Sequence, residues 1–348
     1  MAAKAKRIGI LTGGGDAPGL NSVIESVVRS LSGKGYELVG IRDGFEGIFN
    51  GRTVDLEREA LMGVHSLAGT YLGTSNKSGT AGREEEFRQK YYALKLDGLI
   101  AAGGDGTFAG IQIVLSSDIP LIGVPKTIDN DLEGTDITFG YDTACAVVSE
   151  AVDALRATAD AHRRIIIVET MGRTAGWIAL GGGLASYADA ILLPERPFSR
   201  SELVTYVKRL KNSGRRGLMI VASEGAAAKG EEASIAFKVE GSPQAERFGG
   251  FAERLARWIE GEADWEARHV VLGHLQRSRH PTTTDRFLTL AMGLEAARLV
   301  AAGDWHKAVV YRNGTVTNAP LSDIMKPARL VAPEHRWVRF AQELGIFI

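Results

Sequence analysis

Short apolar runs alternate with amphipathic segments through the first 140 residues. Four runs rich in β-branched and aliphatic residues predict strands: Arg7–Thr12, Glu37–Ile41, Asp97–Ala102 and Ile119–Val124. Hydrophobic residues at helical spacing predict an amphipathic helix over Asn21–Leu31, and a second helix is expected from about Phe108 to Leu115. Strand, glycine-rich turn, helix and strand in this order is the pattern of a doubly wound α/β fold with right-handed connections.

The same pattern restarts near Tyr141, which predicts a second α/β lobe. Its expected elements are a helix from about Thr143 to Asp160, strand Arg164–Glu169, a helix through Gly176–Leu184, a polar helix from Ser201, strands Ala190–Leu193, Leu218–Ala222 and His269–Leu272, and helix Asp285–Ala302. Residues 226–267 are rich in lysine, glutamate and glycine, and they predict a surface insertion with one helical stretch, Phe251–Ile259. The predicted fold class is α/β, with two Rossmann-like lobes, mainly parallel sheets and the active site in the cleft between the lobes.

Length and charge narrow the possible functions. The chain has 348 residues, more than one compact core usually holds, which agrees with two lobes. A net charge of −1 excludes a global basic field that would recruit nucleic acid or an anionic membrane. The single cysteine, Cys145, is typical of a protein in a reducing compartment. Neither a signal peptide nor a run of roughly 20 apolar residues is recognisable. We expect a cytoplasmic protein.

Two glycine-rich turns follow predicted strands and precede predicted helices. Gly13–Gly15 and Gly103–Gly106 therefore place free backbone N–H groups where the helix dipole favours an anion. Neither turn has the spacing of a P-loop or of a dinucleotide fingerprint. The first is also compatible with an ordinary tight turn. In the second, Asp105 is a candidate ligand for Mg²⁺ or a cap for the first helical turn.

The segment Pro125–Asp131 follows the predicted strand Ile119–Val124. It contains a cation, a hydroxyl and two carboxylates, which are the groups that phosphoryl transfer to an alcohol requires. If the segment is extended, Asp129 and Asp131 point the same way, one as a base and one near a metal ion. The alternative is an Asx-turn with solvated carboxylates.

Basic side chains recur near the later strand ends and suggest a site for a second phosphate. They are Arg164, Arg173, Arg268, His274 and Arg277. Each of them alone is also compatible with a solvated surface residue or a structural histidine.

In order along the chain, five motifs resemble those of 6-phosphofructokinase over nearly the whole length. They are Gly14-Gly15-Asp16-Ala17-Pro18-Gly19-Leu20-Asn21, Gly103-Gly104-Asp105-Gly106, Pro125-Lys126-Thr127-Ile128-Asp129-Asn130-Asp131, Glu169-Thr170-Met171-Gly172-Arg173 and Val271-Leu272-Gly273-His274-Leu275-Gln276-Arg277. The resemblance implies a glycolytic kinase that phosphorylates fructose 6-phosphate at its 1-hydroxyl.

The resemblance also implies roles for single residues. Asp129 would be the general base, with Thr127 and Arg173 on the transferring phosphoryl group and Asp105 and Asp131 near Mg²⁺. By the same resemblance, the phosphoryl donor would bind beside Gly15, Gly106, Thr107, Gly110 and Lys126. The sugar phosphate would contact Met171, Gly172, Glu224, His274 and Arg277. Arg164 and Arg268 match positions that the family donates across a subunit interface, which implies a homo-oligomer, at least a dimer and commonly a tetramer.

Two positions point to different phosphoryl donors. Gly106 is similar to the ATP-using members of the family, whereas Lys126 is similar to the pyrophosphate-using members. Because an added side chain excludes a nucleotide by sterics, we give Gly106 more weight and expect ATP, with a reversible pyrophosphate-dependent enzyme or a non-catalytic sugar-phosphate-binding subunit as alternatives. Asn76, with Lys77 beside it, replaces an arginine common in bacterial ATP enzymes. We assign residues 1–140 and about 276–325 to a donor lobe, and 141–275 and about 326–348 to a sugar-phosphate lobe.

Overall fold

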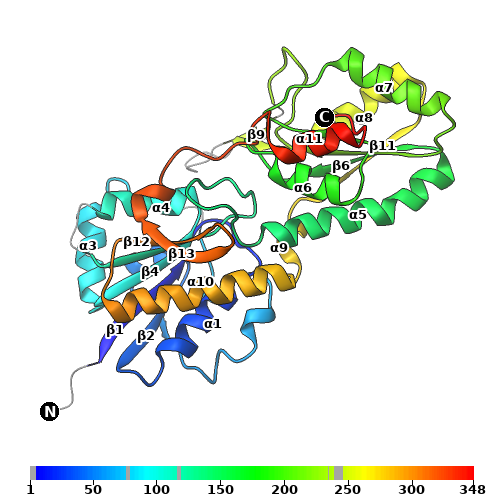
Figure 1. Cartoon of the computed structure of the whole chain (residues 1–348). Coiled ribbons are helices and arrows are strands. Elements are labelled where there is room, and N and C mark those ends of the chain that lie inside the picture. The colour runs from blue at the N-terminus through cyan, green and yellow to red at the C-terminus, as the bar shows by residue number, and fades with distance from the viewer. Residues whose placement is uncertain (1–4, 76–78, 116–118, 234, 239–245) are drawn as a thin grey trace.

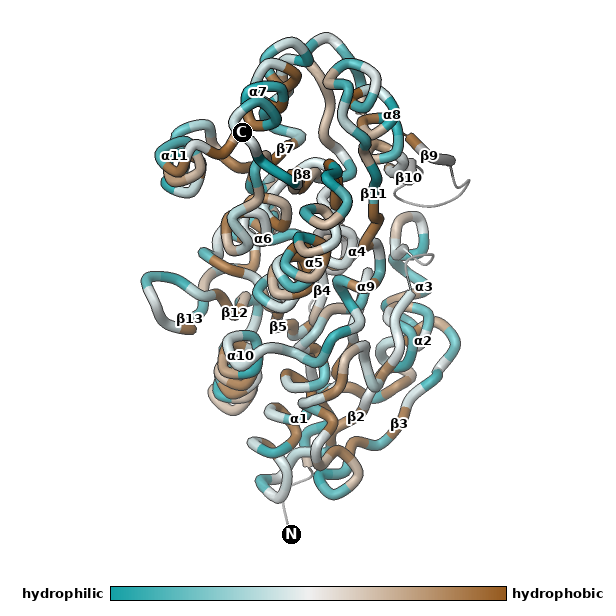
Figure 2. The backbone as a smooth tube through the Cα atoms, turned by 90° about the vertical axis from the view of Figure 1, so that its right-hand side faces the viewer, coloured by the Kyte–Doolittle hydropathy of each residue, from teal (hydrophilic) through white to brown (hydrophobic). Residues whose placement is uncertain are grey.

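The computed structural model describes residues 5–75, 79–115, 119–233, 235–238 and 246–348. Two α/β lobes lie beside each other, and the long helix α5 (Tyr141–His162) runs from one to the other (Figure 1). The C-terminus lies in the second lobe, beside α11 (Figure 2). The predicted α/β class with mainly parallel sheets is confirmed.

A seven-stranded sheet forms the first lobe, in the order β13-β12-β5-β4-β1-β2-β3. Its edge strands β3 and β13 are antiparallel to their neighbours, and the five inner strands are parallel. The strands are β1 (Lys6–Thr12), β2 (Tyr36–Ile41), β3 (Thr53–Asp55), β4 (Gly98–Gly103), β5 (Leu121–Pro125), β12 (Lys307–Arg312) and β13 (Thr315–Pro320). The helices are α1 (Leu20–Leu31), α2 (Phe45–Phe49), α3 (Glu84–Ala93), α4 (Asp105–Leu115) and α10 (Thr283–Ala302), with 3₁₀ turns η1 (Val64–Ser66) and η2 (Leu321–Ile324).

A four-stranded parallel sheet forms the second lobe, in the order β11-β6-β8-β7. Its strands are β6 (Ile165–Thr170), β7 (Ala190–Leu192), β8 (Leu218–Ser223) and β11 (Ala267–Val271). The remaining elements are α6 (Trp177–Ala185), α7 (Arg200–Asn212), α8 (Phe251–Ala263), α9 (Leu275–Ser278), α11 (Arg336–Glu343) and the antiparallel pair β9 (Ile235–Lys238) and β10 (Glu246–Phe248). The chain passes between lobes after β5, through α9 and again before α11 (Figure 1).

A continuous hydrophobic cluster joins the lobes. It runs from residues of α1, such as Val23 and Val27, through Phe139 and Val148 to Trp177 of α6. Val23, Val27, Val28 and Leu31 are buried, as the helical spacing predicts. Burial of apolar surface contributes about 25 cal/mol per Å², so this shared core stabilises the contact between the lobes.

Buried hydrogen bonds reinforce the junction between α5 and α10. The carboxylate of Asp285 accepts hydrogen bonds from Gly140 N and Thr143 N at 2.9 Å each and from Thr143 Oγ1 at 2.5 Å. Thr282 caps the same end of α10 by accepting from Asp285 N. One carboxylate in the first turn of α10 therefore satisfies the N–H groups of the N-cap residue of α5 and of Thr143 in its first turn.

The prediction of a surface insertion over 226–267 is wrong for its second half. Helix α8 extends to Ala263 and packs on β6 and β11. Its residues Phe251, Leu255 and Ile259 are buried in the core of the second lobe. The charged residues that suggested a surface segment occupy the outer face of an amphipathic helix.

Among the described residues, no helix has both the length and the apolar character needed to cross a membrane.

Candidate active site

The loops that follow parallel strands of both lobes carry most of the predicted site residues. In the first sheet β1 lies between β4 and β2, so the strand order reverses at β1. In open α/β sheets, ligands bind beyond the carboxyl ends of the strands at such a reversal. The turn after β1, the N-terminus of α4 and the Pro125–Asp131 segment all lie at this edge.

The two glycine turns pack against each other through Thr107. A Cβ at Gly13 would lie 2.5 Å from Thr107 Oγ1, and the side chain of Thr107 also fills the space beside Gly103. Thr107 is 3% exposed. A Cβ at Gly106, by contrast, would meet no described atom within 4 Å. Gly106 therefore borders open space, whereas Thr107 holds the turns together.

Gly110 lies in packed surroundings. A Cβ there would be 3.0 Å from the ring of Phe45, and its C=O accepts a hydrogen bond from Thr80 Oγ1 at 2.7 Å. The close approach of Phe45 already accounts for a glycine at this position, without a phosphate.

The Pro125–Asp131 segment is bent, which corrects the premise that it is extended. Asn130 has φ 54°, in the left-handed region that asparagine tolerates better than most residues. Its Oδ1 accepts from Thr138 N at 3.0 Å, and Asp129 N donates to Thr127 Oγ1 at 3.0 Å. The turn between the two carboxylates, rather than strand alternation, sets their directions.

Asp129 is a half-buried residue, and one of its carboxylate oxygens, Oδ1, is shielded from solvent. No hydrogen-bond partner for its Oδ1 is found in the described part of the chain. Burial, reinforced by the neighbouring Asp131, raises its pKa to about 6, although Arg277, Lys126 and Arg173 act in the opposite direction. Burial also raises the pKa of Asp131, against hydrogen bonding by Thr127.

Lys126 lies beneath the first glycine turn. Its Nζ donates a hydrogen bond to Gly15 C=O, and the residue is 3% exposed. Burial, followed by repulsion from Arg277, lowers the pKa of Lys126 to about 7. The ammonium group is thus held between the turn after β1 and the carboxylates after β5.

Two side chains from the second half of the chain reach this cluster. Arg277 Nη1 donates to Asp16 C=O at 2.6 Å, and a Cβ at Gly15 would lie 3.0 Å from the same nitrogen. Burial, followed by repulsion from Asp129 and Glu169, raises the pKa of Glu224 to about 7. Arg173 also faces this cluster, because its charge lowers the pKa of Asp129.

The turn after β6 requires its glycine. Gly172 has φ 125°, and a Cβ there would lie 2.7 Å from Ala175 O and 2.8 Å from Ser223 Oγ. Met171 N donates to Gln276 Oε1 at 3.2 Å, which joins the turn to α9. The sequence analysis did not single out Gln276, although this residue stands between His274 and Arg277 in a recognised motif. The structure shows that Gln276 is fully buried.

Two predicted residues, Arg164 and Arg268, are not gathered here. Arg164 and Arg268 lie at the amino end of β6 and β11, about 20 Å of strand from Met171. Arg164 Nε pairs with Glu266 at 2.9 Å, and Arg268 pairs with Glu266 and Glu260. His274 is exposed at the start of α9. Asp105 begins α4, but its side chain lies outside the described part of the structure, as do Asn76 and Lys77.

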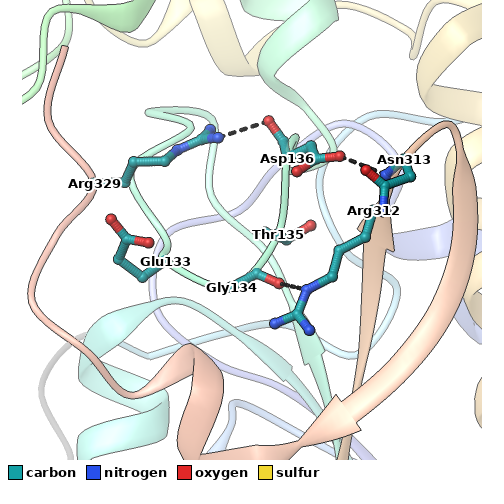
Figure 3. Close-up of a pocket in the computed structure, with 7 residues that line it drawn as sticks. All are labelled: Glu133, Gly134, Thr135, Asp136, Arg312, Asn313 and Arg329. Carbon is teal, nitrogen blue, oxygen red and sulfur yellow. Dashed lines mark hydrogen bonds between the residues drawn. The ribbon is translucent and has the colours of Figure 1, made fainter. Parts of the chain in front are cut away.

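A cavity of about 300 Å³ lies beside residues Glu133–Asp136, which follow the Asp129 segment in the chain (Figure 3). Its lining residues are Glu133, Gly134, Thr135, Asp136, Arg312, Asn313 and Arg329. Its arginines are engaged by the protein itself: Arg312 Nε donates to Gly134 C=O at 2.6 Å, and Arg329 Nη1 donates to Asp136 C=O at 2.7 Å. The candidate active site is the Asp129 cluster, not this cavity.

Residues 7–300 match the family model for phosphofructokinase. The chain is 38% identical to an ATP-dependent 6-phosphofructokinase 2 of Clostridium perfringens, over 98% of each chain. It is also 38% identical to a pyrophosphate–fructose 6-phosphate 1-phosphotransferase of Streptomyces coelicolor, over 98% of this chain and 99% of the relative. The crystal structure of Pichia pastoris phosphofructokinase in the T-state superposes with a TM-score of 0.80 at 27% identity, covering 92% of this chain and 35% of that longer one.

Proposed function

The chain belongs to the phosphofructokinase family, and on that premise we propose that it transfers the γ-phosphoryl group of ATP to the 1-hydroxyl of fructose 6-phosphate. The products are fructose 1,6-bisphosphate and ADP, a step of glycolysis in the cytoplasm. Relatives named as ATP-dependent 6-phosphofructokinases support the activity, at about 40% identity over nearly the full chain.

The observation that carries this proposal is the environment of Asp129. A general base works best when its pKa lies near the operating pH. Burial and Asp131 raise the pKa of Asp129 to about 6, and its Oδ1 lacks a partner among the described residues. An oxygen without a protein partner can accept the proton of a substrate hydroxyl that reaches it. Arg173 and Thr127 are then the groups that stabilise charge on the transferring phosphoryl group.

Mg²⁺ fits the chemistry of the site. Burial raises the pKa of both Asp129 and Asp131, so a cation bound beside them would stabilise their ionised forms. Mg²⁺ prefers one or two carboxylates together with phosphate and water oxygens. Asp131 and Asp105 would hold the ion, which neutralises charge on the donor phosphates when bound. Proton abstraction remains the task of Asp129.

Lys126 and Gly106 bear on the donor. Gly106 borders open space, which suits the passage of a nucleotide phosphate chain. A specific observation also favours the second candidate, a pyrophosphate-dependent enzyme: Lys126 stands beside the Gly15 turn, and one relative of 38% identity is named for pyrophosphate. Because Nζ is already engaged by Gly15 C=O, we assign Lys126 to holding the turn, where it also lowers the pKa of Asp129.

Steady-state turnover with each donor tests the proposal. The protein is assayed with fructose 6-phosphate, Mg²⁺ and either ATP or pyrophosphate at matched concentrations. We expect kcat/KM with ATP to exceed that with pyrophosphate by at least about 100-fold, a difference in transition-state stabilisation of about 2.7 kcal/mol. Robust turnover with pyrophosphate alone would transfer the assignment to the second candidate.

The proposal also assigns a substrate to each lobe and a role to the contact between subunits. Residues 1–140 and about 276–325 form the donor lobe, and 141–275 with about 326–348 form the sugar-phosphate lobe. The sugar-phosphate lobe supplies Met171, Gly172, Glu224 and His274, and Arg277 joins them at the lobe boundary. Arg164 and Arg268 serve the sugar-phosphate site of a neighbouring subunit in a dimer or tetramer, which accounts for their distance from the Asp129 cluster of their own chain.

A further inference from the structure

Arg329 forms hydrogen bonds with the backbone of the segment that carries Asp129. It lies between η2 and α11, where the chain passes from the first lobe to the second. Its guanidinium group donates to Asn130 C=O from Nη2 at 2.7 Å and from Nε at 3.2 Å, and to Asp136 C=O from Nη1 at 2.7 Å. Its own N–H donates to Asp131 C=O at 2.6 Å. A single residue thus holds three carbonyls, two of them in the residues directly after Asp129.

The same arginine is fixed to the second lobe through Trp177. Trp177 Nε1 donates to Arg329 C=O at 2.8 Å, and the guanidinium carbon lies 4.9 Å from the centroid of the indole ring. Trp177 is 5% exposed, and its ring packs edge-on against His335 at 4.9 Å. Trp177 begins α6 four residues after Arg173, so it moves with the turn that carries this arginine.

We propose that Arg329 is a positioning residue, which fixes the Asp129 segment of the first lobe relative to the Arg173 turn of the second. The proposal rests on the proposed phosphoryl transfer, in which Asp129 and Arg173 act on one reacting group from different lobes. A misplacement of about 1 Å costs about 100-fold in rate. Arg329 connects the backbone beside Asp129 to helix α6, which follows the Arg173 turn. This connection is suited to prevent such a misplacement.

The left-handed residue between the two carboxylates explains why the segment needs this hold. A non-glycine residue in that conformation costs about 1–2 kcal/mol and persists only when its surroundings determine it. Asn130 is held on its side chain by Thr138 and on its carbonyl by Arg329. Arginine suits the second task because its planar fork presents five N–H donors, whereas lysine offers a single point of attachment.

Arg312 provides a matched control. It lines the same cavity (Figure 3), but its guanidinium group binds Gly134 C=O and the carboxylate of Asp323. Its side chain therefore has similar surroundings and charge without touching the carbonyls of Asn130 or Asp131.

Amide hydrogen–deuterium exchange tests, independently of activity, whether Arg329 stabilises the backbone of this segment. We expect Arg329→Ala to accelerate exchange of peptides covering residues 126–140 by at least about tenfold, as local opening becomes easier. Arg312→Ala should leave the exchange of Lys126–Asp131 at the wild-type rate. Arg329→Lys, which preserves charge and most of the volume, serves as a second variant if the alanine variant does not fold. Unchanged exchange over 126–140 in both Arg329 variants would overturn the proposal.

Kinetics then tests the positioning role. Arg329→Ala and Trp177→Phe, which removes only the indole N–H donor and some ring area, should lower kcat about 10- to 100-fold. KM for either substrate should change less than about threefold, because the substrate contacts remain. Added guanidinium ion at low millimolar concentration should restore part of the kcat of Arg329→Ala but none of that of Trp177→Phe.

Two kinetic results would contradict the positioning role: wild-type kcat in Arg329→Ala, or a loss confined to KM. A wild-type protein with no transferase activity from either donor would refute the proposed function instead, while the exchange experiment would still decide whether Arg329 holds the segment.

Discussion

Replacing Asp129 by asparagine should change activity and stability in opposite directions. The substitution preserves shape but removes the base, and loss of general-base help costs about 10²- to 10⁴-fold in kcat. That loss corresponds to about 2.7–5.5 kcal/mol of transition-state stabilisation. A coupled assay with fructose 6-phosphate and ATP measures it. The exposed Asp136, whose Oδ2 accepts from Asn313 N at 2.7 Å, offers a matched Asp→Asn control that should retain kcat within about twofold.

The structure gives the sign of the stability effect. Because burial and Asp131 raise the folded pKa of Asp129 from 3.8 to about 6, the folded protein binds more protons than the unfolded chain in this range. The contribution of this group is therefore fully present below pH 3.8 and is lost as the pH rises through about 6. At pH 8 the ionised carboxylate costs on the order of 1–3 kcal/mol, since each unit of pKa corresponds to about 1.4 kcal/mol.

Urea unfolding at pH 5 and pH 8, in buffer containing a chelator, measures this effect. Asp129→Asn should be more stable than the wild-type protein at pH 8, and its advantage should shrink at pH 5. A variant that is inactive and also less stable at pH 8 would refute the reasoning, because it would mean that the carboxylate supports the fold. Wild-type kcat in the asparagine variant would remove Asp129 from the role of base.

Three further substitutions test the account at separate points. Gly106→Asp should leave the urea midpoint unchanged, because its Cβ meets open space. It should lower kcat/KM for ATP at least about tenfold, because the new side chain would occupy the space proposed for the nucleotide phosphates. A loss of stability that matches the loss of activity would contradict this prediction. Asp285→Asn should lower the free energy of unfolding by about 2–3 kcal/mol, measured in urea, because the amide presents a donor to Gly140 N or to Thr143. Gly172→Ala should raise KM for fructose 6-phosphate at least about tenfold, since the Cβ would lie 2.7 Å from Ala175 O and displace the turn; an unchanged KM would show that the turn tolerates the shift.

Local pattern was sufficient to predict most of the secondary structure that positions the site. The helical spacing of Val23, Val27, Val28 and Leu31 indicated α1, and the glycine turns after Thr12 and Ala102 indicated the sheet edge where the candidate site lies. The charged outer face of α8, however, suggested surface where the inner face carries core residues such as Leu255. Composition averages over both faces of a helix, so it hides the buried face of a helix that lies in a polar stretch.

Tertiary contacts account for what the sequence did not reveal about the site. The left-handed turn at Asn130 is held by Thr138 and Arg329, which lie outside the segment, so the segment alone left both an extended chain and an Asx-turn open. Gln276 and Arg329 act through backbone groups over 100 residues away in the chain, at Met171 and Asp131, so neither belongs to a local pattern of catalytic residue types. The raised pKa of Asp129 likewise arises from burial beneath loops of both lobes, which only the fold assembles.

The identity of the product shows whether the protein phosphorylates fructose 6-phosphate from ATP. Wild-type protein is incubated with fructose 6-phosphate, ATP and Mg²⁺, and the phosphorus-31 NMR spectrum is followed over time. We expect the signal of a new phosphomonoester, with its phosphate on carbon 1 of fructose, to grow together with that of ADP. Asp129→Asn should slow the formation of both products by the same factor. Release of inorganic phosphate without a new sugar phosphate, or phosphorylation of the sugar by pyrophosphate but not by ATP, would contradict it.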